Sequence, residues 1–489
     1  MQFRSFKANP PGKPEAEQLM TTPPSSTPPE QVSPAHRGPE HEEPAAFDRG
    51  LWNTRVGFIL AAVGSAVGLG NMWRFPYYTA EHGGAAFVAL YIGLTFLLGI
   101  PLLLAEFSVG RTTRLSPVGA LRKVGGSAWV PMGYVYVLAG FLILAFYSVI
   151  AGWVVRYSLA FLFTGFPADP EAYFNAISTG PNAIGFHLLF MMAVIGIVMG
   201  GVEKGIERAS LIMMPTLFVL VGGLAIWATT LPGSGAGYAF YLSPDWSAIF
   251  NMETFGAATS QAAFSLSLGM GAMLTFASYL SRNESLPREG TVIAFSDFAV
   301  AFTAGLLVFP VIFALGLEGA VGDSTVGALF IALPGGFATM GDTLGRIVGT
   351  VFFLALLIGA VTSAISLLEV VTSSMIDEFG WGRKKAAVVT GLVITAAGAW
   401  PALDLNALDA YDQLTGKVFL PLGALGLAVL VGWVMKNPLE EITIGSGPGA
   451  RRLFGAWLVM LRFVAPILLA VVLWENVPAA VEAIGNLFR

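Results

Sequence analysis

The stretch Gly64-Ser-Ala-Val-Gly-Leu-Gly-Asn-Met-Trp-Arg-Phe-Pro76 lies in the middle of the first long apolar segment, which runs from about residue 54 to residue 80. That segment is long enough to cross a bilayer, yet its centre holds three glycines together with Asn71 and Arg74. Clustered glycines make local unwinding of a helix cheap, and unwound backbone at membrane depth is tolerated only inside protein or beside a polar cavity. Small-xxx-small packing explains the glycines equally well, but polar residues at this depth are functional candidates. The stretch therefore predicts a broken helix that binds a ligand or an ion.

The composition is that of a polytopic membrane protein. Of 489 residues, 55% are hydrophobic and 12% are charged, and the mean hydropathy is +0.71. A soluble enzyme of this size could not cover its surface with so few polar residues. The chain has no cysteine and only four histidines, two of which, His36 and His41, lie near the N-terminus. We therefore expect no disulfides, no thiolate or imidazole metal site and no histidine-based catalysis.

The apolar segments number eleven, which predicts an all-α protein with eleven transmembrane helices. Residues 1–46 precede them and are rich in proline, which predicts a disordered cytoplasmic tail. With the N-terminus inside the cell, most loop Lys and Arg residues are cytoplasmic, and only Arg346, Lys417 and Arg489 are outside. This predicts a multi-pass protein of the plasma or inner membrane with an extracellular or periplasmic C-terminus.

A second interruption, Ser265-Leu-Ser-Leu-Gly-Met-Gly-Ala272, lies in the sixth apolar segment. Segments one and six correspond if the first ten form two halves of five, residues 47–231 and 254–436, which leaves residues 453–489 for the eleventh helix and a short C-terminus. Five is an odd number, so the second half enters the membrane with inverted orientation. Broken helices at corresponding positions of inverted repeats indicate a midplane binding site of a secondary transporter.

Further polar residues lie inside the apolar segments. Glu106 and Glu369 are expected to be structural, accepting hydrogen bonds from amides that a broken helix frees. Thr362 and Ser363 of the eighth segment either serve a site or donate back to carbonyls of their own helix.

Several motifs, taken together, are typical of one family of transporters. They are Trp52-Asn-Thr-Arg-Val-Gly-Phe58, the Gly64–Pro76 stretch, Gly99-Ile-Pro-Leu102 with Glu106, Lys204-Gly-Ile-Glu-Arg208, Met214-Pro-Thr216, Ser265–Gly271 and Thr362-Ser363. Over about residues 49–474 the sequence resembles the neurotransmitter:sodium symporter family, which includes bacterial amino-acid transporters. The resemblance implies the LeuT-type fold, a five-plus-five inverted repeat with helices one and six broken.

The resemblance also implies two sodium sites at the breaks. The first would use the carbonyl of Ala66 and the side chains of Asn71, Ser265 and Asp297. The second would use the carbonyls of Gly64, Val67 and Gly359 and the hydroxyls of Thr362 and Ser363. Oxygen ligands of this kind suit a hard cation such as Na⁺.

An amino-acid substrate is implied between the breaks. Amine-transporting relatives have an Asp where this chain has Gly68, so the ligand should bring its own carboxylate. We expect that carboxylate at the amides of Leu69 and Gly70, the positive end of a half-helix, and at the Tyr147 hydroxyl. The other expected contacts are Ser65, Ala66, Ile143, Phe264, Ser265, Ser267, Met270, Ser363 and Leu367. Because Ile143, Phe264, Met270 and Leu367 are apolar, they favour an apolar side chain.

Chloride-dependent relatives hold their anion at a position where this chain differs. Tyr91, Gln261 and Ser265 fit the pattern, but Asp297 replaces an Asn and Ala301 replaces a Ser. A fixed carboxylate offsets the charge of Na⁺, so the resemblance implies chloride-independent transport. Alternatively, Asp297 takes up a proton during the return step.

The resemblance implies gates on both sides of the site. Arg74 and Asp412 would pair outside it, Arg49 and Asp377 would pair inside it, and Trp52 would plug the inner path. Ion pairs near water contribute about 1 kcal/mol or less, so they can break in each cycle.

The main hypothesis is sodium-coupled symport of a neutral amino acid by alternating access. A transport-silent sensor or interaction protein with the same fold is the alternative, and it predicts binding without uptake. An intramembrane enzyme is disfavoured because no nucleophile, base and orienting group converge in the sequence. The expected partners are a small amino acid and the lipid bilayer, without nucleic acid, and the oligomeric state stays open.

Overall fold

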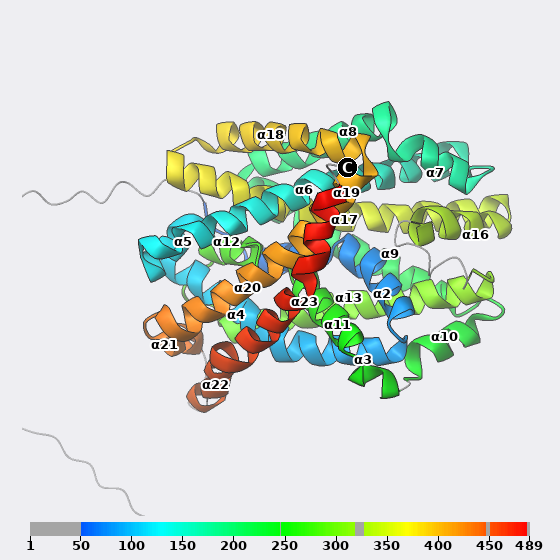
Figure 1. Ribbon diagram of the computed structural model, residues 1–489. Helices are drawn as coiled ribbons and strands as arrows, with labels where there is room; N and C mark the ends of the chain where they lie inside the picture. Colours follow the sequence, from blue (N-terminus) through cyan, green and yellow to red (C-terminus); the bar gives the residue numbers. More distant parts are fainter. Residues whose placement is uncertain (1–49, 245, 318–326, 446–449, 487–489) are drawn as a thin grey trace, which may run out of the picture. The chain divides into compact units, whose positions relative to one another are not determined.

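The computed structural model describes residues 50–244, 246–317, 327–445 and 450–486. The predicted tail (1–46), Arg49 and residues 487–489 lie outside these ranges. Within them the chain is helical and contains no strand. The helices, shown in Figure 1, are α1 (Arg55–Ala66), α2 (Phe75–Glu81), α3 (Ala85–Leu94), α4 (Ile100–Thr113), α5 (Pro117–Gly125), α6 (Val130–Leu159), α7 (Pro170–Ser178), α8 (Gly180–Met199), α9 (Arg208–Ala228), α10 (Ser234–Leu242), α11 (Met252–Ser265), α12 (Ala272–Ser278), α13 (Leu286–Ala314), α16 (Leu333–Thr339), α17 (Asp342–Phe379), α18 (Arg383–Leu403), α19 (Leu405–Leu414), α20 (Leu420–Val429), α21 (Pro438–Thr443), α22 (Ala450–Val459) and α23 (Ala465–Asn486).

Nine continuous helical stretches of the described residues are long and apolar enough to cross a membrane. Some of them combine two helices: π-helical turns join α3 to α4, α19 to α20 and α22 to α23. A tenth span consists of α1 and residues 70–81, which meet at a break with a 46° bend. The remaining predicted segment is α11 plus α12, which are separated by residues 266–271 and are each too short to cross alone. Each of the eleven predicted segments is therefore helical.

The two breaks have different local causes. In the first, Val67 is extended, with φ −78° and ψ 94°, and ends α1 before the glycines that follow. In the second, Ser267, Gly269 and Gly271 have φ of 54°, 78° and 74°. Left-handed backbone costs a residue with a side chain roughly 1–2 kcal/mol, which explains glycine at two of these positions and leaves Ser267 strained.

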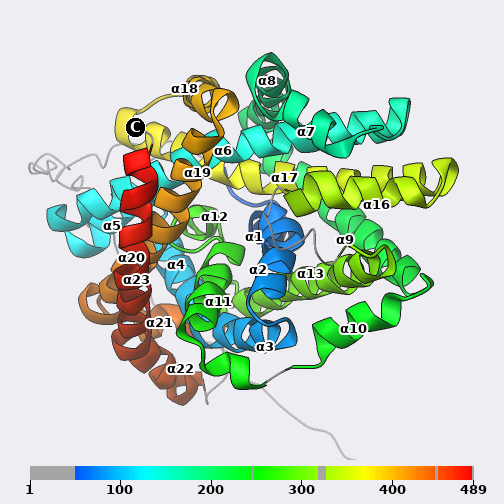
Figure 2. The ribbon, with the colours of Figure 1, turned by 45° about the vertical axis from the view of Figure 1, so that its right-hand side comes forward.

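Helices at corresponding positions of the two predicted halves pack against each other. The third and eighth spans, α6 and α17, lie along one another, as do the fourth and ninth, α8 and α18, and α1 contacts α12. Figure 2 shows the blue α1 and α2 between α17 and α13. The boundaries predicted for the two halves stay predictions, but the broken helices lie inside the bundle, where their free backbone groups are shielded from lipid.

Candidate functional site

A small cavity lies between the two breaks and is closed by α6 and α17. Its volume is about 30 Å³, and it is lined by Ser65, Ala66, Gly68, Gly70, Ile143, Tyr147, Phe264, Ser267, Met270, Ser363, Ser366 and Leu367. The structure thus brings together every residue predicted to contact the substrate except Leu69 and Ser265. Leu69 lines a neighbouring pocket instead, and Ser265 belongs to a buried network described below.

Gly68 and Ser366 line the cavity but were missing from the predicted contacts. A Cβ on Gly68 would overlap the Ser363 hydroxyl and lie 3.1 Å from the Tyr147 hydroxyl, so a side chain there would fill the space between them. The Ser366 hydroxyl accepts a 2.8 Å hydrogen bond from that of Ser65. The signal for Ser366 was its spacing, because residues three apart on a helix share a face with Ser363.

Backbone groups freed by the first break are held by side-chain hydroxyls. The carbonyl of Ser65 accepts hydrogen bonds from Ser267 at 2.8 Å and from Ser363 at 3.3 Å. The amide of Leu69 donates to the Tyr147 hydroxyl at 3.2 Å. A ligand or ion can replace such hydroxyls, because the carbonyls and amides have no partner within a helix.

Three residues of the first predicted sodium site form one buried network. The Asn71 amide donates to Asp297 Oδ1 at 2.7 Å and to the Ser265 hydroxyl at 3.1 Å. Ser265 donates to Asp297 Oδ2 at 2.7 Å, and the Tyr91 hydroxyl donates to Ser265 at 3.1 Å. Among the described residues, no Lys or Arg forms an ion pair with Asp297. This buried carboxylate therefore offers negative charge to a bound cation.

The residues of the second predicted sodium site also meet, where α1 ends against α17. A Cβ on Gly64 would lie 2.9 Å from Thr362 Cβ, and one on Gly359 would lie 3.6 Å from the Val67 carbonyl oxygen. Ser363 donates to the Gly64 carbonyl at 3.2 Å. The Thr362 hydroxyl instead donates to carbonyls of its own helix, those of Ile358 and Gly359, both at 3.1 Å.

Glu106 and Glu369 were both expected to accept hydrogen bonds from amides of a broken helix. Glu106 does so, because its carboxylate accepts from the amides of Gly269 and Leu274, both at 2.9 Å. The expectation is wrong for Glu369, which accepts from Arg383 Nη1 at 2.7 Å and from the Tyr279 hydroxyl at 2.5 Å. Arg383 begins the next helix and brings a full charge, which binds a buried carboxylate more strongly than amides do.

A pocket of about 320 Å³ adjoins the cavity on the side predicted to face out of the cell, and both Arg74 and Asp412 line it. The ion pair predicted between them is not formed, since no ion pair within 4.0 Å joins these two described residues. Instead, Arg74 donates to the Tyr78 hydroxyl at 2.8 Å, and its guanidinium lies 4.6 Å from the ring centroid of Phe264. The two predicted partners nevertheless lie in the same neighbourhood, because a Cβ on Gly416 would lie 3.5 Å from Arg74 Nη1 and 3.9 Å from Asp412 Oδ1.

On the side predicted to face the cytoplasm, Trp52 is hydrogen-bonded to α12. Its indole donates to the Phe276 carbonyl at 2.9 Å, and the two rings meet edge to face at 5.3 Å. The carboxylate of Glu207 accepts from the amides of Asn53 and Thr54 at 2.8 and 2.9 Å. The segment before α1 is therefore held against α12 and Glu207 at the end of the broken helices that is predicted to face the cytoplasm.

The inner ion pair predicted between Arg49 and Asp377 cannot be described, because Arg49 lies outside the described residues. Asp377 accepts a hydrogen bond from the amide of Ser116 at 2.7 Å.

Comparison with known proteins agrees with this geometry. A model of the sodium:neurotransmitter symporter family matches residues 49–173 and 175–483. An uncharacterised sodium-dependent transporter of Methanocaldococcus jannaschii is 35% identical, covering 87% of this chain and 90% of the relative. One of Bacillus subtilis is 33% identical, covering 86% and 96%.

Among solved structures, the crystal structure of MhsT in complex with L-phenylalanine is 41% identical, with a TM-score of 0.80, and covers 87% of this chain and 99% of MhsT. At this identity the match supports both the LeuT-type fold and the family. The chain therefore belongs to the sodium:neurotransmitter symporter family, as a multi-pass, sodium-dependent membrane transporter and not an enzyme.

Proposed function

We propose that this protein imports a neutral, apolar amino acid together with Na⁺ by alternating access. The observation that carries the proposal is the cavity between the two breaks, whose lining combines free backbone groups with an apolar wall and contains no carboxylate. A cationic amine would find no counter-charge there. An amino acid carries both charges itself and can use the amides and carbonyls of the breaks.

The substrate is proposed to bind with its carboxylate toward the amides of Leu69 and Gly70 and its side chain toward Ile143 and Met270. A cavity of about 30 Å³ has room for roughly two waters, so the site must widen to admit an amino acid. L-Phenylalanine is the first candidate, because the related MhsT was crystallised with it. Pocket shape alone discriminates weakly, by about 1–3 kcal/mol per methylene, so the proposal extends to the apolar class.

Two Na⁺ ions are proposed to bind, one at Asn71, Ser265, Asp297 and the Ala66 carbonyl, and one where α1 ends against α17. The carboxylate of Asp297, which forms hydrogen bonds but no ion pair with a described Lys or Arg, supports the first site and makes a mobile chloride ion unnecessary. The second site has neutral ligands only, which favours release of its ion once the site opens.

Alternating access is proposed because the two sides of the cavity differ. The outer side bears an open pocket of about 320 Å³, whereas Trp52 and its bond to Phe276 cover the inner side. This arrangement suits an outward-facing state in which Gly70, Tyr147 and Phe264, which line both spaces, separate the pocket from the cavity. The proposal includes a cytoplasmic N-terminus and a plasma or inner membrane location, since the basic loops lie on the same side as Trp52.

Uptake into liposomes tests the proposal. The purified protein is reconstituted, and accumulation of radiolabelled L-phenylalanine is measured with an inward Na⁺ gradient, with K⁺ in its place, and with gluconate replacing chloride. We expect uptake that requires Na⁺ and is unchanged in gluconate. Binding of phenylalanine without uptake in any gradient would instead identify a sensor with a transporter fold.

A further inference from the structure

Arg462 is a charged residue inside an apolar membrane span. The span runs from Phe454 to Pro478, and Arg462 is eight residues, or about 12 Å at 1.5 Å per residue, beyond its start. Arg462 is exposed at the periphery of the helix bundle. A charge that faces lipid inside such a span is costly unless it finds a partner or its long side chain extends to the membrane interface.

One nitrogen of this arginine has a structural partner. Arg462 Nε donates a 2.6 Å hydrogen bond to the carbonyl of Gly432, which lies in the final π-helical turn before Met435 leaves the helix. Carbonyls in the last turn of a helix have no partner further along the chain, so Arg462 caps this end. The hydrogen bond to Gly432 uses Nε alone. The two terminal nitrogens, Nη1 and Nη2, have no hydrogen-bond partner among the described residues, and no described Asp or Glu forms an ion pair with them.

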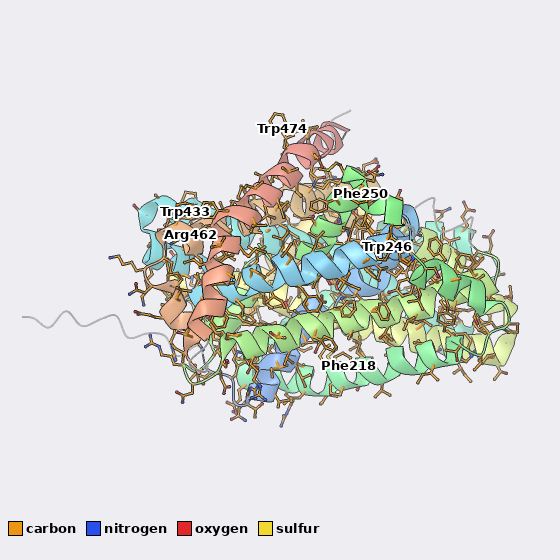
Figure 3. All side chains as sticks on the ribbon, turned by 90° about the horizontal axis from the view of Figure 1, so that it is seen from below. Phe218, Trp246, Phe250, Trp433, Arg462 and Trp474 are labelled. Carbon is orange, nitrogen blue, oxygen red and sulfur yellow. The ribbon has the colours of Figure 1, made fainter. Side chains whose placement is uncertain are left out.

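The surroundings of Arg462 are aromatic and apolar. Its guanidinium lies 5.6 Å from the ring centroid of Trp433, whose indole donates back to the Arg462 carbonyl at 3.3 Å. Figure 3 shows Trp433 and Arg462 side by side next to the α22–α23 ribbon, with Trp474 toward its other end. Exposed residues spaced four apart, Val459, Phe463, Ile467 and Val471, form an apolar stripe along the same span.

We propose that Nη1 and Nη2 of Arg462 bind the phosphate of a membrane phospholipid whose acyl chain lies along this apolar stripe. A guanidinium presents two parallel donors that match phosphate oxygens. The cap on Gly432 fixes the side chain, and Trp433 provides the amphipathic ring typical of the membrane interface. Trp433 is three residues from Lys436 in the chain, on the side of the membrane to which the basic loops are assigned, where anionic lipids are attracted.

A lipid fits these observations better than a free anion or a second copy of the chain. Free phosphate would use the guanidinium but not the exposed stripe beside it. A second copy would need a carboxylate opposite Arg462 at the same depth, and the described surface around the stripe displays apolar residues instead.

Native mass spectrometry of the full chain, purified in detergent, tests this proposal by measuring how tightly lipids bind. Phosphatidylglycerol is compared with a diacylglycerol glycolipid that has the same acyl chains and no phosphate. We expect phosphatidylglycerol to bind about fivefold more tightly, the contribution of one basic residue near a membrane surface. Arg462→Gln should abolish the preference for phosphatidylglycerol, and Arg462→Lys should keep part of it. The control variant Arg282→Gln changes an exposed loop arginine and should keep the preference in full.

Arg462→Gln also removes the hydrogen bond to Gly432 and is therefore expected to lower stability. Trp433→Leu, which keeps the arginine, is a second variant in which lipid binding is measured. It should weaken binding of both lipids while preserving the preference for phosphatidylglycerol. An unchanged preference in a folded Arg462→Gln variant overturns the proposal. So does a shift from dimer to monomer in that variant, since it would identify the stripe as a contact between copies.

Discussion

The hydroxyl of Ser267 on the broken sixth helix donates a 2.8 Å hydrogen bond to the carbonyl of Ser65 on the broken first helix. One contact thus joins the two interruptions, although some 200 residues separate them in the chain. Ser267 holds this contact from a left-handed backbone with φ 54°, which a glycine would adopt at lower cost.

Substitutions at Ser267 should separate the hydrogen bond from the backbone strain. Ser267→Ala loses the bond and keeps the strain, whereas Ser267→Gly loses the bond and relieves it. We expect the glycine variant to be more stable than the alanine variant by about 1 kcal/mol, and both to bind phenylalanine less tightly than the unmodified chain. Denaturant unfolding in detergent measures the first difference, and equal stability of the two variants would show that no strain is stored there.

A side chain at Gly68 should block the cavity. The Cβ of Gly68→Ala would overlap the Ser363 hydroxyl, and overpacking of this kind costs about 1–3 kcal/mol. We expect phenylalanine to bind about fivefold to a hundredfold more weakly, measured by equilibrium binding in Na⁺. Gly93→Ala is the matched control, because a Cβ on Gly93 meets nothing within 4 Å; equal losses in both variants would refute a local steric effect.

Asp297→Asn should weaken sodium binding and create a need for chloride. Removing one partner of a buried charge pair costs roughly 3–5 kcal/mol, so sodium affinity should fall at least about a hundredfold in gluconate. Chloride should restore part of it by supplying the missing negative charge. The exposed Asp342, changed to Asn, controls for net charge. Undiminished sodium affinity in Asp297→Asn would remove this residue from the site.

Glu106→Gln should destabilise the second break. Glu106 accepts two amide hydrogen bonds from the sixth span, and a glutamine would turn an NH₂ group toward one of those donors. Leaving a buried donor unsatisfied costs about 1–3 kcal/mol. We expect a lower unfolding midpoint at equal phenylalanine saturation, and a variant of unchanged stability would argue against the structural role.

Trp52→Ala should open the inner side, because it removes the hydrogen bond to Phe276 and the ring contact with it. The chain has no native cysteine, so a single Thr275→Cys substitution beside Phe276 reports access from the inner face. We expect a membrane-impermeant thiol reagent to label Thr275→Cys faster when Trp52→Ala is added. The control is a cysteine at the exposed Arg282, whose labelling rate should not change.

Much of the fold followed from sequence because each break carries a local signal. Three glycines beside Asn71 and Arg74 indicate unwinding at membrane depth, and the glycines at 269 and 271 take left-handed backbone that other residues avoid. The apolar lengths located the remaining helices. Most of the cavity lining was implied by the resemblance to the symporter family, since the residues on the two long helices, such as Ile143 and Leu367, carry no local signal of their own.

The incorrect or missing predictions concern partners that no local pattern specifies. Glu369 pairs with Arg383 because the turn between α17 and α18 brings the arginine back to it, a tertiary contact that is not visible in the spacing. Arg74 and Asp412 line the same pocket without forming an ion pair, because Arg74 instead donates to the Tyr78 hydroxyl and lies over the ring of Phe264. Ser366 was detectable by its helical spacing from Ser363 but not by composition.

Coupled movement of the two solutes tests the central claim most directly. Proteoliposomes with equal Na⁺ on both sides are given an inward gradient of L-phenylalanine, and entry of radioactive sodium is followed. Symport predicts that the phenylalanine gradient drives sodium inward, and that Asp297→Asn abolishes this flux in gluconate. Entry of phenylalanine with no movement of sodium would contradict the account, because Na⁺ would then be a structural ligand and not a coupled substrate.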